Sequence, residues 1–316
     1  MRSVEGMEFR RLGNSGLVVS VVGLGTNNLG MRLDMERSRE VVEAALDNGI
    51  TLFDTADSYG ASEERIGEIL EGRRDDVILA TKFGSDVRKR GLSNGEDWDA
   101  RGSRRYIVRA VESSLRRLRT DWIDLYQLHW PDPATPIEET LAALDELVRA
   151  GKVRYIGSSN MRGWQVADAE WTARSRGLHR FVSAQNEYSL LNRDVEDDLV
   201  PALEEYGIGL LPYFPLASGL LTGKYRRGEQ APENSRLAGR PERLTDEAFD
   251  KVEALESFAK GRGVTILDVA IGGLAAQPAV SSVIAGATSR DQVERNVAAG
   301  NWQPTLEDLA ELDAIT

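Results

Sequence analysis

Short apolar runs alternate along the chain with longer segments in which apolar residues recur every three or four positions. The short runs are typical of buried strands, and the longer segments of amphipathic helices that cover them. The runs predict eight strands, at residues 21–24, 51–53, 77–80, 123–128, 153–156, 181–185, 208–212 and 283–285. The longer segments predict helices at residues 35–48, 63–71, 104–118, 137–150, 164–176, 195–206, 246–261, 265–276, 291–299 and 305–315.

Eight strand–helix units predict one α/β domain over residues 1–316, a (β/α)8 TIM barrel, because eight parallel strands close such a barrel. Residues 9–12 and 18–21 flank the turn Gly13–Gly16 and predict an N-terminal β-hairpin. Two long connections, residues 84–101 and 217–243, follow strands and predict extra helices and loops at the C-terminal face. A doubly wound open sheet is the alternative, but no GxGxxG motif follows the first strand.

The composition limits the classes of partner and of site that this chain can have. The 316 residues include 51 acidic and 39 basic ones, a net charge of −12, which argues against nucleic acid and anionic membranes as partners. The absence of cysteine excludes disulfides, thiolate nucleophiles and Cys-ligated zinc, and two histidines are few for a metal site, so no metal is expected. The first residues have no apolar signal-peptide region, and no run of about 18 apolar residues exists. We therefore expect a cytoplasmic protein with no membrane partner.

Four polar residues lie at or just beyond the ends of predicted strands: Asp54, Tyr59, Lys82 and His129. Singly, each has a structural interpretation, as a turn former, a packed ring, a solvated cation or a satisfied histidine. Strand ends converge at one mouth of a barrel, so the four can meet there.

Such a cluster is suited to proton transfer. A tyrosine is a weak acid with a pKa of about 10, and a nearby ammonium stabilises its phenolate. A carboxylate would hold the lysine, and a neutral histidine could orient a carbonyl oxygen. Together these groups make an acid that can protonate a forming alkoxide.

Motifs through nearly the whole chain, from about Phe9 to about Leu312, resemble the aldo-keto reductases. They include GLGTNNLG, FDTADSYGASEERIGEIL, TKFG, IDLYQLHWPD, GKVRYIGSSNM, QNEYSLL, PYFPLASGLLTGKY and VIAGATSRDQVERNV. The sequence is most similar to the bacterial branch that also resembles potassium-channel β subunits. The resemblance implies an NADP(H)-dependent oxidoreductase that reduces a small-molecule aldehyde or ketone. It also implies that Asp54, Tyr59, Lys82 and His129 form the catalytic tetrad, with Tyr59 as the general acid.

The resemblance further implies a set of cofactor-binding residues, each with its own part of the dinucleotide. Those by the nicotinamide ribose and carboxamide would be Gly25, Thr26, Asp54, Ser159, Asn160 and Gln185, with Tyr213 stacked on the ring. Those by the pyrophosphate would be Phe214, Leu216, Ser218, Gly219, Leu221 and Lys224. Those by the adenosine 2′-phosphate and adenine would be Gly286, Ser289, Arg290, Gln292 and Asn296.

The last segment bears on the choice of cofactor. Gly286 and Gln292 stand where the aldose-reductase branch has lysine and arginine, and Arg295 stands where the channel-subunit branch usually has glutamate. The resemblance therefore favours NADPH and leaves use of NADH open. Arg290 is the natural phosphate partner, with a solvated charge at a helix start as its alternative interpretation.

Two other functions compete with the reductase. The likeness to channel subunits allows a nicotinamide-binding regulatory or sensor subunit with slow turnover. A metal-dependent barrel hydrolase would need carboxylates for ligation. Trp98, in the first long connection, and Trp130, beside His129, are candidates to line a substrate pocket. The substrate, the direction of reaction and the oligomeric state are left open by the sequence.

Overall fold

The computed structural model describes residues 6–85, 100–233 and 235–316, and within them one eight-stranded sheet dominates. Its strands are β3 Val22–Gly25, β4 Leu52–Asp54, β5 Ile78–Phe83, β6 Ile123–Leu128, β7 Val153–Ser159, β8 Phe181–Gln185, β9 Gly209–Leu210 and β10 Val283–Gly286. All neighbours pair in parallel, in the order β10-β3-β4-β5-β6-β7-β8-β9.

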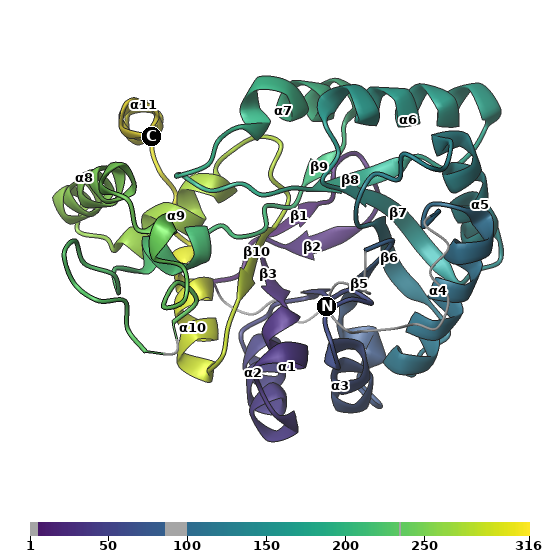
Figure 1. Ribbon diagram of the computed structural model, residues 1–316, viewed down its shortest axis with the longest axis horizontal. Coiled ribbons are helices and arrows are strands. Elements are labelled where there is room, and N and C mark those ends of the chain that lie inside the picture. The colour runs from purple at the N-terminus through teal and green to yellow at the C-terminus, as the bar shows by residue number, and fades with distance from the viewer. Residues whose placement is uncertain (1–5, 86–99, 234) are drawn as a thin grey trace.

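The two edges of this sheet meet. Leu210 forms a parallel bridge with Val280, and the backbone N–H of Ile284 donates to the carbonyl of Pro212 at 3.0 Å. The sheet therefore closes on itself, and the (β/α)8 TIM barrel expected from the sequence is confirmed (Figure 1).

Helices surround the barrel in chain order, while α8 packs beside α9 and α11 beside α8 (Figure 1). They are α1 Asn27–Met31, α2 Met35–Asp47, α3 Ser62–Ile69, α4 Arg104–Leu118, α5 Ile137–Arg149, α6 Gly163–Arg176, α7 Val195–Tyr206, α8 Asp246–Arg262, α9 Ile266–Ala275, α10 Arg290–Ala299 and α11 Leu306–Ile315. Short 3-10 turns are η1 Arg74–Asp76, η3 Ala217–Thr222 and η4 Pro241–Arg243. Side-chain caps fix helix starts locally, as where Asp34 accepts from the N–H of Arg37 at 2.9 Å.

β1 Phe9–Arg11 and β2 Val18–Ser20 form the predicted N-terminal hairpin, and this hairpin closes the amino end of the barrel. Its turn donates from Asn14 N to the carbonyl of Gly207 at 2.8 Å, just before β9. Leu12 and Val19 pack on an apolar cluster inside the barrel, and a larger cluster lies between strands and helices. Because the hairpin closes the barrel at the amino ends of the strands, the open mouth lies at their carboxyl ends.

Some elements differ from the prediction for physical reasons. β5 continues through Thr81 and Lys82 because these polar side chains find buried partners, and β7 continues through three small residues after Ile156, where its register shifts. β9 is only two residues long, and α1, η3 and η4 lack the apolar periodicity that predicts helices.

Candidate active site

The four residues at strand ends reach the mouth of the barrel from neighbouring strands. Asp54 is the last residue of β4, Lys82 lies in β5, and His129 directly follows β6. Tyr59 lies in the loop between β4 and α3. Because β4, β5 and β6 are parallel neighbours, their carboxyl ends open on one side, and the structure brings the four side chains together there.

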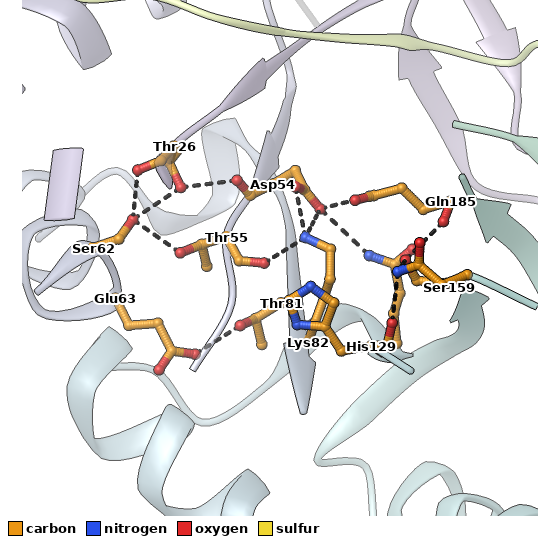
Figure 2. Close-up of polar contacts among 12 residues, drawn as sticks. Thr26, Asp54, Thr55, Ser62, Glu63, Thr81, Lys82, His129, Ser159 and Gln185 are labelled. Atoms are coloured by element: carbon orange, nitrogen blue, oxygen red, sulfur yellow. Dashed lines mark hydrogen bonds and ion pairs between the residues drawn. The ribbon is translucent and has the colours of Figure 1, made fainter. Parts of the chain in front are cut away.

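Lys82 and Asp54 form a buried ion pair (Figure 2). Lys82 Nζ lies 2.8 and 2.7 Å from the two carboxylate oxygens and donates to the carbonyl of Thr55 at 2.9 Å. Burial lowers the pKa of Lys82, but the Asp54 carboxylate and the phenol of Tyr59 raise it by more, so its pKa lies above the ordinary value. Lys82 is therefore a fixed ammonium ion at neutral pH.

Two amides also hold the Asp54 carboxylate. Gln185 Nε2 donates to Oδ1 at 2.8 Å, and Gln127 Nε2, from β6, reaches the same oxygen at 3.4 Å. A buried carboxylate needs such partners, because desolvation without them is costly. Gln127 was missed by the sequence reasoning, since its only sequence signal is a polar residue within an apolar strand.

Tyr59 lies between the lysine and the histidine. Lys82 Nζ is 5.0 Å from the centroid of the Tyr59 ring, and a side-chain hydrogen bond between the two contributes to the raised pKa of Lys82. The rings of Tyr59 and His129 meet edge to face, with centroids 5.9 Å apart. An ammonium ion beside a phenol stabilises the phenolate, so this arrangement makes the phenolic proton easier to transfer.

A chain of buried hydroxyl groups fixes the loop that carries Tyr59 (Figure 2). Thr55 Oγ1 donates to Ser62 Oγ at 2.9 Å, Ser62 Oγ lies 2.9 Å from Thr26 Oγ1, and Thr26 Oγ1 donates to the carbonyl of Asp54 at 2.8 Å. The chain ties the end of β3 to both ends of this loop. Thr26 thus holds the loop that carries Tyr59 and also lies where the resemblance implies a cofactor contact.

A second network lies on the other side of His129. Asn160 Nδ2 donates to the carbonyl of His129 at 2.9 Å and to Ser159 Oγ at 3.0 Å, while Tyr213 donates to Asn160 Oδ1 at 2.8 Å. Ser159 Oγ donates to the carbonyl of Gln185 at 2.7 Å. Burial and then the nearby charges raise the pKa of Tyr213 to about 12, so it remains a neutral phenol. The residues expected around the nicotinamide are therefore contiguous with the Asp54–Lys82 pair.

The turn after Tyr213 is strained. Phe214, Ala217 and Ser218 have positive φ values of 53°, 46° and 59°, and Gly219 has φ 100°. Such conformations are rare for residues other than glycine and concentrate at functional sites. Three N–H groups of the turn, those of Ala217, Gly219 and Leu221, donate to carbonyls within it at 2.9, 2.7 and 3.3 Å, so the turn holds its own strained shape. A Cβ on Gly219 would lie 2.8 Å from Lys224 Nζ, so that ammonium lies over the turn.

Arg236 reaches the same region and was not singled out from the sequence. Its guanidinium lies 5.1 Å from the centroid of the Phe214 ring and donates to Asn28 Oδ1 at 3.2 Å. Burial first, then the charges of Arg32 and Arg240, lower the pKa of Arg236. Positive charge is therefore concentrated around Arg236, which favours an anionic ligand.

The expected adenosine end lies at the start of α10. Ser289 caps this helix by accepting from Gln292 N at 3.4 Å, and Asn296 is buried one turn further on. Gly286 ends β10 beside them. Arg290, however, donates to Asp47 Oδ2 at 3.1 Å and lies 3.8 Å from Glu294 Oε1, so in this structure its charge faces two carboxylates.

These residues fit a dinucleotide. Amide and hydroxyl groups lie beside the four residues, the ammonium of Lys224 over the turn suits a diphosphate, and the amino end of α10 favours a further anion. This fit to a dinucleotide depends on backbone conformation and on where helices begin. The pattern of apolar residues in the sequence predicts neither feature.

Two other expectations concern substrate contacts. Trp130 is 49% exposed and stacks on the His129 ring with centroids 6.3 Å apart, so it flanks the tetrad. Trp98 lies outside the described residues, as does most of the connection from 84 to 101.

In the described part of the chain, no group of three His, Asp or Glu side chains is arranged to hold a metal ion. Over the same residues, no helix is both long and apolar enough to cross a membrane.

Comparison with known proteins gives one consistent family. Residues 21–316 match the model of the Aldo/keto reductase family. The chain is 35% identical to a probable voltage-gated potassium channel subunit beta of Arabidopsis thaliana, over 98% of this chain and 95% of that protein. It is 36% identical to the aldo-keto reductase YhdN of Bacillus subtilis (strain 168), over 98% and 93%. It is 33% identical to an L-glyceraldehyde 3-phosphate reductase of Escherichia coli O157:H7, over 97% and 92%.

Proposed function

The chain belongs to the aldo/keto reductase family, and on this premise we propose that it uses NADPH to reduce an aldehyde or ketone to an alcohol. The observation that carries the proposal is the placement of Tyr59 between the Lys82–Asp54 ion pair and His129. This is the arrangement expected of a phenol that donates its proton to a carbonyl oxygen.

In the proposed mechanism, bound NADPH supplies a hydride to the carbonyl carbon, since no side chain can do so. Tyr59 donates its phenolic proton to the carbonyl oxygen as charge develops there. Lys82 stabilises the resulting phenolate, and Asp54 holds Lys82 protonated and in place. The His129 ring, fixed between Tyr59 and Trp130, orients the carbonyl oxygen by donating a hydrogen bond.

The cofactor contacts follow the same order along the mouth. Ser159, Asn160 and Gln185 would bind the carboxamide, with Tyr213 against the ring. The strained turn and Lys224 would bind the diphosphate, with Arg236 as an additional cation.

The preference for NADPH depends on Arg290. Its partner Asp47 is 59% exposed at the side chain, and exposed pairs of this kind are worth about 0–1 kcal/mol. A 2′-phosphate brings close to two negative charges and three acceptor oxygens, so it would compete well for the guanidinium. NADH, which lacks this group, would gain nothing from Arg290.

A second candidate, a regulatory or sensor subunit that binds the nicotinamide cofactor and turns over slowly, is favoured by the 35% identity to a probable channel subunit. It would keep every cofactor contact and differ only in rate and in having a protein partner.

The test is a panel of aldehydes and ketones, with NADPH consumption as the readout and NADPH binding followed by fluorescence. We expect turnover with several carbonyl compounds, and Tyr59→Phe to slow it by about 10²–10⁴-fold while NADPH still binds. Equal rates for Tyr59→Phe and the parent would refute the acid assignment. Tight NADPH binding with negligible turnover across the panel would favour the regulatory role instead.

A further inference from the structure

A second carboxyl group lies behind Lys82, and the proposed mechanism does not use it. Asp57 is in the loop between β4 and α3, and its backbone N–H donates to the carbonyl of Lys82 at 3.1 Å. The residue as a whole is partly exposed, but both of its carboxylate oxygens are shielded from solvent. Within the described part of the chain, neither oxygen accepts a hydrogen bond of ordinary geometry, and the hydrogen-bonding contact that lowers its pKa is a weak one from the backbone of Ser58. An ionised carboxylate would be buried there with little compensation, which is costly.

Charged groups from each neighbouring element face this carboxyl. Glu63 comes from α3 and Arg117 from α4, and the two form an ion pair at 2.6 Å. Glu63 is only 1% exposed and also accepts from Thr81 Oγ1 at 2.7 Å (Figure 2). Lys82 comes from β5. From β6 comes the phenol of Tyr126, whose oxygen is also buried and without a partner among the described residues.

Together, these neighbouring groups do little to stabilise a negative charge on the Asp57 carboxyl. Burial and then the Glu63 carboxylate raise the pKa of Asp57 to about 8, against the opposing effects of Arg117, Lys82 and the backbone of Ser58. The two cations oppose it weakly because each already has a carboxylate of its own, Arg117 with Glu63 and Lys82 with Asp54.

Tyr126 supplies no compensating charge. Burial, and then the negative charges of Asp57 and Glu63, raise the pKa of Tyr126, with a smaller contribution from Tyr106 on α4. The phenol of Tyr126 therefore stays neutral and does not offset a negative charge on Asp57.

We propose that Asp57 is a positioning residue for the Tyr59–Lys82 pair: its carboxyl is neutral while reduction runs at full rate, and its ionisation slows reduction. The inference rests on the proposed function. A second negative charge behind Lys82 opposes formation of a phenolate at Tyr59, so the phenol holds its proton more tightly. The single positive charge of Lys82 then interacts with the carboxylate of Asp57 as well as that of Asp54, and it stabilises the Tyr59 phenolate less.

The first test is the pH profile of carbonyl reduction in the parent and in Asp57→Asn, which is neutral at every pH. In the parent we expect a partial fall near pH 8, ahead of any final loss of activity. The ratio of Asp57→Asn to parent should then rise by about threefold to tenfold between pH 6 and pH 9. Asp75→Asn is the matched control, since Asp75 is exposed in η1 and its ratio to the parent should be flat. A flat ratio for Asp57→Asn overturns the inference, because a purely structural role lowers activity alike at all pH values.

Glu63→Gln is the second variant, and the structure predicts the direction in which it shifts the pH profile. It removes a charge that raises the pKa of Asp57 and leaves Arg117 unopposed, so the partial fall should move to lower pH. A step that stays near pH 8 or moves upward would contradict the assignment to Asp57.

The third measurement needs neither cofactor nor activity. Carbon-13 NMR of carboxyl-labelled aspartate in the cofactor-free protein should show one resonance titrating near pH 8, absent in Asp57→Asn. Titration of Asp57 near its ordinary value overturns the inference whether or not the protein reduces carbonyl compounds. Titration near pH 8 in a protein that reduces none overturns the proposed function and the catalytic role of Asp57 with it.

Discussion

Gly30 touches the backbone of Tyr59 so closely that a Cβ on residue 30 would lie 1.7 Å from the Tyr59 carbonyl oxygen. The same Cβ would lie 2.6 Å from the N–H nitrogen of Ser62. Gly30 lies inside α1, where glycine costs about 1 kcal/mol relative to alanine. The contact explains why a glycine stands there: α1 packs directly on the loop that carries the proposed acid.

Gly30→Ala should therefore act on catalysis rather than on the barrel. The loop must move to admit the methyl group, and a displacement of about 1 Å at a catalytic group can cost about 10² in rate. Steady-state kinetics would show the loss, and urea unfolding should show a cost of about 1–3 kcal/mol.

Gly261→Ala is the matched control for this prediction. Gly261 lies in α8, and an added methyl group there would have nothing within 4 Å, so this variant should keep its rate. If Gly30→Ala reduces carbonyl compounds as fast as Gly261→Ala, the contact does not position Tyr59.

The buried pair of Lys82 and Asp54 should be costly to break from one side. Lys82→Met leaves the Asp54 carboxylate buried with only amide donors, which we expect to lower the free energy of unfolding by about 3–5 kcal/mol. Lys152→Met is the control, because its pair with Glu112 is 40% exposed on both sides and should be worth at most about 1 kcal/mol. The double variant Asp54→Leu/Lys82→Met should recover part of the loss in urea unfolding. Equal costs for the two single variants would contradict this account.

The pH dependence of stability offers a test of Asp57 that is independent of catalysis. Its pKa is about 8 in the folded protein against an ordinary value of 3.8, so between these values the folded state keeps a proton that the unfolded state has lost. The contribution of Asp57 to the free energy of unfolding of the parent should therefore fall as pH rises from about 4 to about 8, and level off above. Asp57→Asn removes this slope. Its stability relative to the parent should rise by at most about 4 kcal/mol by pH 7, roughly three pH units at about 1.4 kcal/mol each.

Urea unfolding of parent and Asp57→Asn across this range measures the difference directly. Asp75→Asn again serves as the exposed control, with a difference from the parent that does not follow the same course. A constant difference between parent and Asp57→Asn from pH 4 to pH 8 would show that the carboxyl is not held neutral.

The apolar runs of the sequence were sufficient to locate the strands, and with them the residues that stand at strand ends. They were insufficient wherever a polar residue continues a strand because it finds a partner far away in sequence, as Lys82 does with Asp54. Gln127, Gly30 and Asp57 were missed for a related reason. Their importance depends on which atoms a neighbouring element brings within reach, and one sequence carries no record of those contacts.

The pairing of Arg290 with Asp47 is another contact of this kind, since the two residues are 243 positions apart. It also makes the cofactor preference testable. If Arg290 turns to the 2′-phosphate when NADPH binds, Arg290→Ala removes a charge-assisted hydrogen bond worth about 1.5–3 kcal/mol. The Kd for NADPH should then rise by about tenfold or more, while the Kd for NADH stays within about twofold.

Asp47→Asn should have the opposite effect, because it frees the guanidinium of Arg290 from its exposed partner and so favours NADPH slightly. Arg176→Ala is the control, since Arg176 lies on α6 and forms an exposed pair with Glu138 at 2.9 Å. Fluorescence titration of both cofactors against the three variants separates the outcomes. Equal weakening of NADPH and NADH by Arg290→Ala would mean that this arginine shapes the start of α10 without reading the phosphate, and selectivity would then have to come from Ser289 and Gln292.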